Sequence, residues 1–293
     1  MVRLDSLRSP QVARPHVREL RVVTINTGKC DGAYRARIGW LADELCRLDP
    51  DIVACQEAFA AEDGSVDTAA ELARWLGLYL TTAPARFKQR LCEGRQIAGW
   101  SGLALLGRRP WLEPRVIALP SDERDGERVA LIARTVYDGR EVVVANVHLT
   151  HLRQADALRG AQLDHVLRQP QLARDGAVRL LCGDFNTSAD GPVLAPRLAD
   201  VEGCSLRDAY AAGGGRAPRG TLISVGGRPA ACGPCIDFIL SVADDDGSHP
   251  GFRDARVVLN RAHPQSGLYP SDHAGVAVTV PLDGRGPAAS MSS

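Results

Sequence analysis

Several features that would indicate a membrane protein or a strongly charged binding protein are missing from this sequence. No run of about 18 apolar residues occurs, so we expect no transmembrane helix. Residues 1–16 lack the apolar core of a signal peptide, which predicts a cytoplasmic location. The 293 residues carry a formal net charge of zero, so no global attraction to nucleic acid or to an anionic membrane is expected.

Common catalytic and nucleotide-binding motifs are also absent. No Gly-x-Ser-x-Gly elbow occurs, which argues against a serine hydrolase. Neither a Walker loop nor a Rossmann fingerprint is present. Lysine is scarce, since Lys29 and Lys88 are the only two. Arginine binds phosphate bidentately, but genomic base composition is the simpler cause of this bias.

The eight cysteines give little support for redox or zinc chemistry. Cys232 and Cys235 match a Cys-x-x-Cys pattern, but a redox pair needs a helix N-terminus to lower the thiol pKa. Here the strand-like run 236–240 follows, so we expect a loop with structural thiols or a facultative disulfide. A four-cysteine zinc site needs a second close pair, which is missing. Three others lie in apolar patterns and are expected to be buried: Cys46, Cys55 and Cys182.

Hydrophobic periodicity predicts a chain of mixed strands and helices. We expect one domain over residues 20–281, preceded by a flexible arm (1–19) and followed by a disordered tail (282–293). Asp138-Gly139, between two β-rich runs, predicts a hairpin. The segment 81–100 reads as a loop and contains a local basic cluster, either a solvated loop or a contact for a polyanion: Arg86, Lys88, Arg90 and Arg95. The predicted helices are 34–48, 66–76 and 155–167, and the predicted strands are 20–26, 51–57, 102–106, 128–136, 140–149, 178–182, 236–240, 255–259 and 274–280.

The stretch 178–186 is the centre of the chemical argument. A buried strand runs into Gly183-Asp184-Phe185-Asn186. Side chains at i and i+2 of an extended segment share one side, so Asp184 and Asn186 can face one small target. An Asx turn that closes the strand is the structural alternative.

Polar side chains mark six strand ends or flanking turns, and groups at strand ends can converge on one cleft. Carboxylates with amides are hard donors that suit Mg²⁺ or Mn²⁺ better than zinc. Histidines can add an acid, a base or an oxyanion partner. A metal-assisted phosphoester hydrolase fits this donor set. The positions are Asn26, Glu57, Asn146 with His148, Asp184 with Asn186, Asp237, and Asp272 with His273.

These motifs, in this order, resemble the endonuclease/exonuclease/phosphatase superfamily, which includes DNase I, exonuclease III-like enzymes and neutral sphingomyelinases. The matching motifs span residues 20–281 and are specific only as a set. The resemblance implies an α/β fold, a four-layer α/β/β/α sandwich in which two mixed β-sheets pack face to face with helices outside. The motifs are Thr24-x-Asn26, Gln56-Glu57, Asn146-x-His148-Leu149, Gly183-Asp184-x-Asn186, Ile236-Asp237-Phe238-Ile239 and Ser271-Asp272-His273.

The resemblance also implies roles for individual residues. Glu57 would be the main Mg²⁺ ligand (Mn²⁺ being possible), with Asn26 nearby and Asp272 supporting the metal or the loop of His273. Asp184 and Asn186 would hold the attacking water and the phosphate, and His148 would donate to a phosphate oxygen. His273, oriented by Asp237, would be the general acid or base. Whether Asp184 or His273 takes the proton of water stays open.

The expected function is Mg²⁺-dependent hydrolysis of a phosphodiester, most simply in nucleic acid, by a monomer. The alternatives are a phospholipase C- or sphingomyelinase-like enzyme, an inositol or nucleotide phosphatase, and an inactive binding module of the same fold. AP endonucleases usually carry tyrosine where His148 stands, which disfavours that branch. His151 lies outside the facing set, so we expect it to be structural or on the surface.

Overall fold

The computed structural model describes residues 18–173, 176–198, 206–223 and 233–282. Almost all of the predicted arm (1–19) and tail (282–293) lies outside these residues, as does Cys232. None of the helices in the described part of the chain has the length and apolar character of a membrane span.

Two six-stranded mixed sheets form the centre of the fold, as predicted. The first has the order β11-β12-β1-β2-β4-β3 and the second the order β5-β6-β7-β8-β10-β9. Pairs β1–β2 and β7–β8 are parallel, and the other neighbours are antiparallel. The strands are β1 (Glu19–Asn26), β2 (Ile52–Ala61), β3 (Tyr79–Cys92), β4 (Arg95–Gly107), β5 (Leu112–Ala118), β6 (Val129–Tyr137), β7 (Arg140–His148), β8 (Val178–Asp184), β9 (Leu206–Asp208), β10 (Asp237–Val242), β11 (Arg253–Val258) and β12 (Gly275–Pro281).

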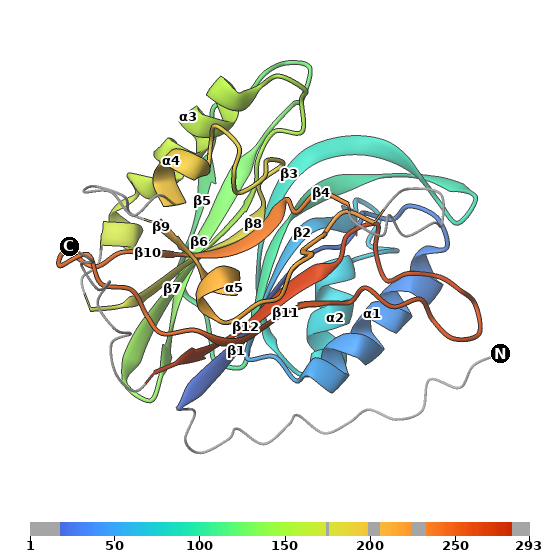
Figure 1. Ribbon diagram of the computed structural model, residues 1–293. Helices are drawn as coiled ribbons and strands as arrows, with labels where there is room; N and C mark the ends of the chain where they lie inside the picture. The colour runs from blue at the N-terminus through green and yellow to red at the C-terminus, as the bar shows by residue number, and fades with distance from the viewer. Residues whose placement is uncertain (1–17, 174–175, 199–205, 224–232, 283–293) are drawn as a thin grey trace.

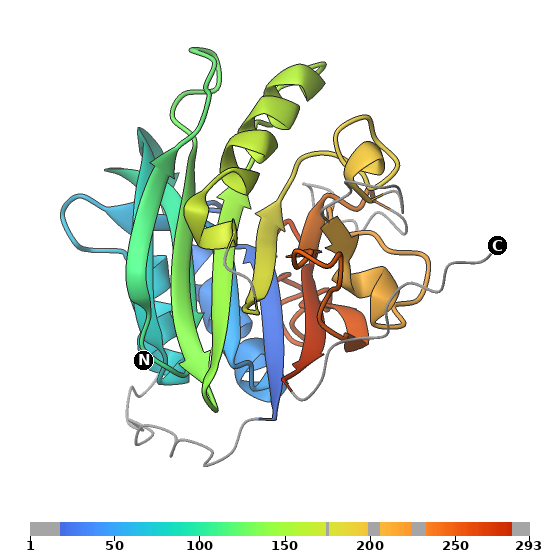
Figure 2. The ribbon, with the colours of Figure 1, turned by 90° about the vertical axis from the view of Figure 1, so that its left-hand side faces the viewer.

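Helices cover the outer faces of both sheets, which confirms the four-layer α/β/β/α sandwich. In Figure 1, α1 and α2 flank the first sheet, and α3 lies on the opposite side of the molecule. In Figure 2 the second sheet faces the viewer, with α3 in front and α1 and α2 behind. The helices are α1 (Tyr34–Leu48), α2 (Thr68–Leu76), α3 (Asp156–Leu167), the short α4 (Ala195–Leu198) and α5 (Ala209–Ala212), and a 3-10 turn (Pro170–Ala173).

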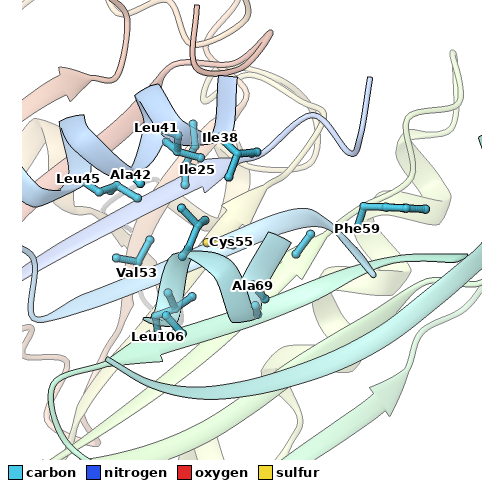
Figure 3. Packing of buried hydrophobic residues seen from close by; sticks show 14 of the residues in the cluster. Ile25, Ile38, Leu41, Ala42, Leu45, Val53, Cys55, Phe59, Ala69 and Leu106 are labelled. Atoms are coloured by element: carbon cyan, nitrogen blue, oxygen red, sulfur yellow. The ribbon is translucent and has the colours of Figure 1, made fainter. Parts of the chain in front are cut away.

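Alternating side chains of each strand build three apolar cores, one between each pair of layers. Val23 and Val53 of the first sheet belong to the core beneath α1 and α2, together with Leu41. Figure 3 shows Val53 and Leu41 in this cluster. Their neighbours Val22 and Ile52 point the other way, into the core shared with the second sheet. A third core joins the second sheet to α3. This packing fixes the distance between the two sheets and therefore between side chains at their ends.

Two predictions about local structure are wrong. The segment 81–100 is not a loop but most of the long β3–β4 hairpin, which curves over one edge of the molecule in Figure 1. Its strands pair along their length, yet β3 is largely exposed, so it lacks the apolar alternation that identifies a strand. The second error is the end of β2, which runs past Glu57 to Ala61. The Asp138-Gly139 hairpin is confirmed, with φ of 47° and 80°, as the turn type requires.

Candidate active site

Strand register brings the predicted polar side chains to one end of the sandwich. Asp184, the last residue of β8, lies beside His148 of β7 in parallel register and beside Asp237 of β10 in antiparallel register. Asn26 ends β1 in the facing sheet. A pocket of about 390 Å³ opens here. Asn146 and Asp237 are not part of its lining, but the other predicted residues are: Asn26, Glu57, His148, Asp184, Asn186, Asp272 and His273.

His273 lies between two buried carboxylates. Its Nδ1 is 2.9 Å from Asp237 Oδ2, and its Nε2 is 3.8 Å from Asp184 Oδ2. Burial by itself lowers the pKa of His273, but the charge and hydrogen bond of Asp237, with smaller contributions from Asp184 and Asp272, outweigh burial and raise the pKa to about 10. At neutral pH the ring is therefore an imidazolium that donates to Asp237 and points its second N–H toward Asp184.

Asp184 accepts two hydrogen bonds, and its surroundings disfavour the charged form of its carboxyl group. Its Oδ2 accepts from Asn26 Nδ2 at 3.0 Å, and its Oδ1 accepts from the main-chain N–H of Asn186 at 2.9 Å. Burial, and then the neighbouring Asp237 charge, raise the pKa of Asp184 to about 7. The carboxyl group can therefore exchange a proton close to neutral pH.

His148 is the neutral histidine of the site. Its Nε2 lies 3.5 Å from Asp184 Oδ2. Burial, and then the charge of Arg128, lower the pKa of His148 well below its usual range. The two histidines on either side of Asp184 thus differ in charge, because only His273 has a carboxylate partner of its own on the far side.

Glu57 reaches the pocket through a β-bulge. The β2–β4 register shifts between Cys55 and Ala58, and Glu57 adopts a left-handed φ of 53°. A bulge leaves a residue unpaired and re-aims its side chain, so the carboxylate enters the pocket from mid-strand. The prediction of a strand-end carboxylate is wrong in this respect, although Glu57 does line the pocket.

The donor set at Glu57 fits a divalent cation. Glu57 Oε2 already holds a cation, because Lys29 Nζ lies 2.8 Å away. Asp272 faces the same pocket, next to Gly28, where a Cβ would lie only 2.8 Å from Asp272 Oδ1. Asn26 Oδ1 accepts from Gly28 N–H at 3.0 Å, which leaves one lone pair for a ligand. Carboxylate and amide oxygens of this kind suit Mg²⁺.

Asp184, Asp237 and His273 form a second cluster of possible metal ligands, apart from the donors around Glu57. Ligand atoms of Asp184, Asp237 and His273 all lie within 4.8 Å of one another. The 2.9 Å contact between His273 and Asp237 is a hydrogen bond, so this nitrogen is committed to its carboxylate. The cluster therefore keeps His273 Nε2 on the side of Asp184, where it can serve proton transfer or face a metal.

Asn186 does not lie as the extended pattern predicts. Its φ is 50°, and its main-chain N–H caps Asp184 in the Asx-turn geometry that was the alternative. Its Nδ2 donates to Leu149 O at 3.0 Å. The turn still leaves Asn186 in the pocket lining, so the Asx turn does not remove it from the candidate site.

One wall of the pocket is basic. Arg86, Lys88 and Arg90 lie at alternate positions of β3 and line the pocket, whereas Arg95 of the predicted cluster does not. Their charges interact, since Arg86 lowers the pKa of Lys88. The zero net charge of the chain therefore conceals a local positive surface.

Lys29, Arg128 and His151 also line the pocket and are missing from the sequence-based site. Arg128 is 7% exposed and binds buried Asp125 through two hydrogen bonds of 2.9 and 2.7 Å. His151, expected to be structural or on the surface, has Nδ1 2.9 Å from Asp125 Oδ1. No sequence pattern identifies Arg128 as a site residue. The scarcity of lysine is a signal that could have drawn attention to Lys29 as a candidate site residue.

Cys235 shows no sign of redox chemistry. It precedes β10 rather than a helix, and burial raises its thiol pKa to about 12. A reactive cysteine needs the opposite shift.

Residues 23–273 match the sequence profile of the Endonuclease/Exonuclease/phosphatase family. No curated protein sequence matches the chain. A humanized D. rerio TDP2 is similar in structure, with a TM-score of 0.69 and 20% identity over 89% of this chain and 98% of that one. An endonuclease/exonuclease/phosphatase from Beutenbergia cavernae has a TM-score of 0.68 and 20% identity over 91% and 72% of the two chains. D. rerio TDP2 complexed with a single-strand DNA product has a TM-score of 0.67 and 19% identity over 89% and 98%.

Proposed function

The chain belongs to the endonuclease/exonuclease/phosphatase family, and from this premise we propose that it is a Mg²⁺-dependent phosphoesterase that hydrolyses a phosphodiester bond in nucleic acid. The observation that carries the proposal is the His273 ring between Asp237 and Asp184, in a pocket with a basic wall. Such a site can take a proton at one atom, give one at another and bind an anion.

The two pKa shifts divide the proton transfers between two residues. Asp184, with a pKa of about 7, is the acceptor for the proton of the attacking water, because a base works best near the operating pH. His273, with a pKa of about 10, keeps its proton and donates it from Nε2 to a phosphoryl or leaving oxygen. Neutral His148 donates a hydrogen bond to a non-bridging oxygen.

Glu57 and Asp272, with Asn26 beside them, are the residues that would hold a divalent cation. When bound, the cation neutralises negative charge on the phosphate and on the leaving oxygen. Asn26 has a second task, since its amide N–H fixes Asp184 Oδ2 at 3.0 Å.

The basic wall supports nucleic acid as the substrate. Arg86, Lys88 and Arg90 give a row of cations next to the candidate site, and contacts with successive phosphates dominate nucleic-acid affinity. The single-strand DNA product in the D. rerio TDP2 structure supports the same substrate class.

A panel assay with Mg²⁺ tests the proposal against plasmid DNA, single-stranded DNA, RNA, sphingomyelin and inositol phosphates. We expect cleavage of a nucleic acid that stops in excess EDTA and is lost in His273→Gln. His263→Gln is the matched control, because His263 lies on an exposed loop. If only a lipid or an inositol phosphate were cleaved, that class would replace nucleic acid as the proposed substrate. Full turnover in EDTA would remove the proposed metal dependence, and no hydrolysis of any substrate would remove the enzymatic proposal.

A further inference from the structure

We propose that Lys29 is a built-in counter-ion that holds the Glu57 carboxylate in the metal-free protein and exchanges it for the substrate phosphate when a divalent cation binds. The inference rests on the proposed function, and it assigns a positioning and substrate-binding role to a residue outside the predicted site. Its starting point is the 2.8 Å contact between Lys29 Nζ and Glu57 Oε2 inside the pocket.

The main chain around Lys29 is held rigidly. Gly28 and Lys29 have left-handed φ angles of 65° and 54°, and a non-glycine residue adopts this conformation at a cost. The Arg37 guanidinium fixes the turn by donating to five main-chain carbonyls, at 3.2 Å to Thr27, 3.2 Å to Gly28, 3.4 Å to Lys29 and 2.8 Å to both Asp31 and Pro270. A turn secured in this way holds Lys29 beside the pocket while its four-carbon side chain stays free to move.

The main chain around Glu57, across the pocket from Lys29, also has a fixed and unusual conformation. Glu57 sits in the β2 bulge with a φ of 53°. Thr27 joins the two segments, because its N–H and its hydroxyl both donate to Gln56 O, at 2.9 and 3.1 Å. Two strained residues that face each other across a secured junction indicate a functional pair rather than a chance surface contact.

Charge explains why the pair exchanges partners. A divalent cation at Glu57 takes the carboxylate and repels the ammonium group by like charge. Lys29 then has an unpaired charge within a pocket that also receives the phosphate. Two neighbouring cations have partners that a metal at Glu57 does not take, since Arg128 binds Asp125 and Arg90 donates to Ser101 Oγ at 3.2 Å. Binding of a metal at Glu57 therefore removes the ion-pair partner of Lys29.

The scarcity of lysine makes the exchange observable without any activity assay. Protein labelled with ¹³C and ¹⁵N in lysine gives two sets of side-chain signals, one from Lys29 and one from Lys88, and Lys88→Arg assigns them. We expect Mg²⁺ alone to shift the Lys29 signal and to leave Lys88 nearly unchanged. Inorganic phosphate added to the Mg²⁺-bound protein should then shift Lys29 again. In Glu57→Gln the first response should disappear.

Calorimetry supplies a matched pair of variants, because Lys29 and Lys88 both line the pocket. Lys29→Met should strengthen Mg²⁺ binding by about fivefold, the upper end for a partly exposed ion pair, whereas Lys88→Met should change it much less. Equal effects would mean that only total charge matters and would overturn the inference. So would an unchanged Lys29 signal in protein that binds Mg²⁺ and hydrolyses substrate. Absence of both Mg²⁺ binding and hydrolysis would instead remove the proposed function.

Discussion

Replacing Asp237 by asparagine should move both limbs of the pH–activity profile toward lower pH. The proposed roles require Asp184 to be deprotonated and His273 to be protonated. In the wild-type protein kcat/KM should therefore rise with pH through about 7 and fall above about 10, following the two pKa values. Asp237 raises both of these pKa values, so removing its charge lowers both.

The structure sets the size of the effect on the alkaline limb. Asp237 is fully buried, and its Oδ2 lies 2.9 Å from His273 Nδ1. An opposite charge this close shifts a pKa by roughly 1–3 units, and the absence of solvent screening favours the upper end. Burial, which lowers the pKa of His273, is then opposed only by the charges of Asp184 and Asp272. The alkaline limb should therefore fall from about 10 by about 2 units.

The assay is kcat/KM against pH for the wild type and Asp237→Asn, with Asp244→Asn as the control. Asp244 pairs with buried Arg179 at the start of β8. Asp244→Asn therefore breaks an ion pair on the strand that ends in Asp184, without changing a contact of His273. Stability gives a second readout. The raised pKa of His273 contributes stability that is fully present below its unfolded pKa of about 6.5. That contribution is lost as the pH rises through about 10. If the alkaline limb of Asp237→Asn coincided with that of the wild type, the imidazolium assignment would be wrong.

Three further changes test other parts of the site. Glu57→Gln should raise the Mg²⁺ concentration needed for half-maximal activity by about tenfold or more, with little change in melting temperature; activation at the wild-type concentration would refute the ligand assignment. Gly183→Ala should lower the free energy of unfolding by about 3 kcal/mol or more in urea denaturation, because a Cβ would lie 2.0 Å from Val147 O. Cys232→Ser/Cys235→Ser should keep full turnover, since the Cys235 thiol is buried and protonated, and loss of hydrolysis by folded protein would contradict this.

Much of the fold could be predicted because its central elements carry strong patterns. The helix predicted over 34–48 has those bounds, since Pro50 follows and Asp49 takes a left-handed φ of 50° that ends it. β8 is buried along its whole length, and Arg179 alone interrupts the apolar pattern of its residues 178–182. That arginine is compatible with burial because it donates to Leu172 O at 3.0 Å and pairs with Asp244.

The parts that could not be predicted depend on contacts between distant segments. The bulge at Glu57 arises from pairing between β2 and β4, and neither strand marks it in its own sequence. The β3–β4 hairpin is held by main-chain pairing, which leaves no hydrophobic pattern on its exposed faces. The place of Lys29 in the pocket could not be predicted, because it depends on residues distant in the fold. Arg37 fixes the turn of Lys29, and Glu57 forms an ion pair with its ammonium group.

Gln56 and Asn146 show why the motif set extends beyond the pocket lining. Gln56 Nε2 donates to Asn146 Oδ1 at 2.7 Å, and Asn146 Nδ2 donates to Cys55 O and Ala104 O at 2.8 and 2.9 Å. These buried bonds join β7 of one sheet to β2 and β4 of the other. Because buried amides lose much free energy when left unpaired, the bridge opposes any sliding of the sheets. Asn26 and Asp184 meet across the same interface at 3.0 Å, so the bridge holds the two halves of the site at the separation that the proposed proton transfer requires.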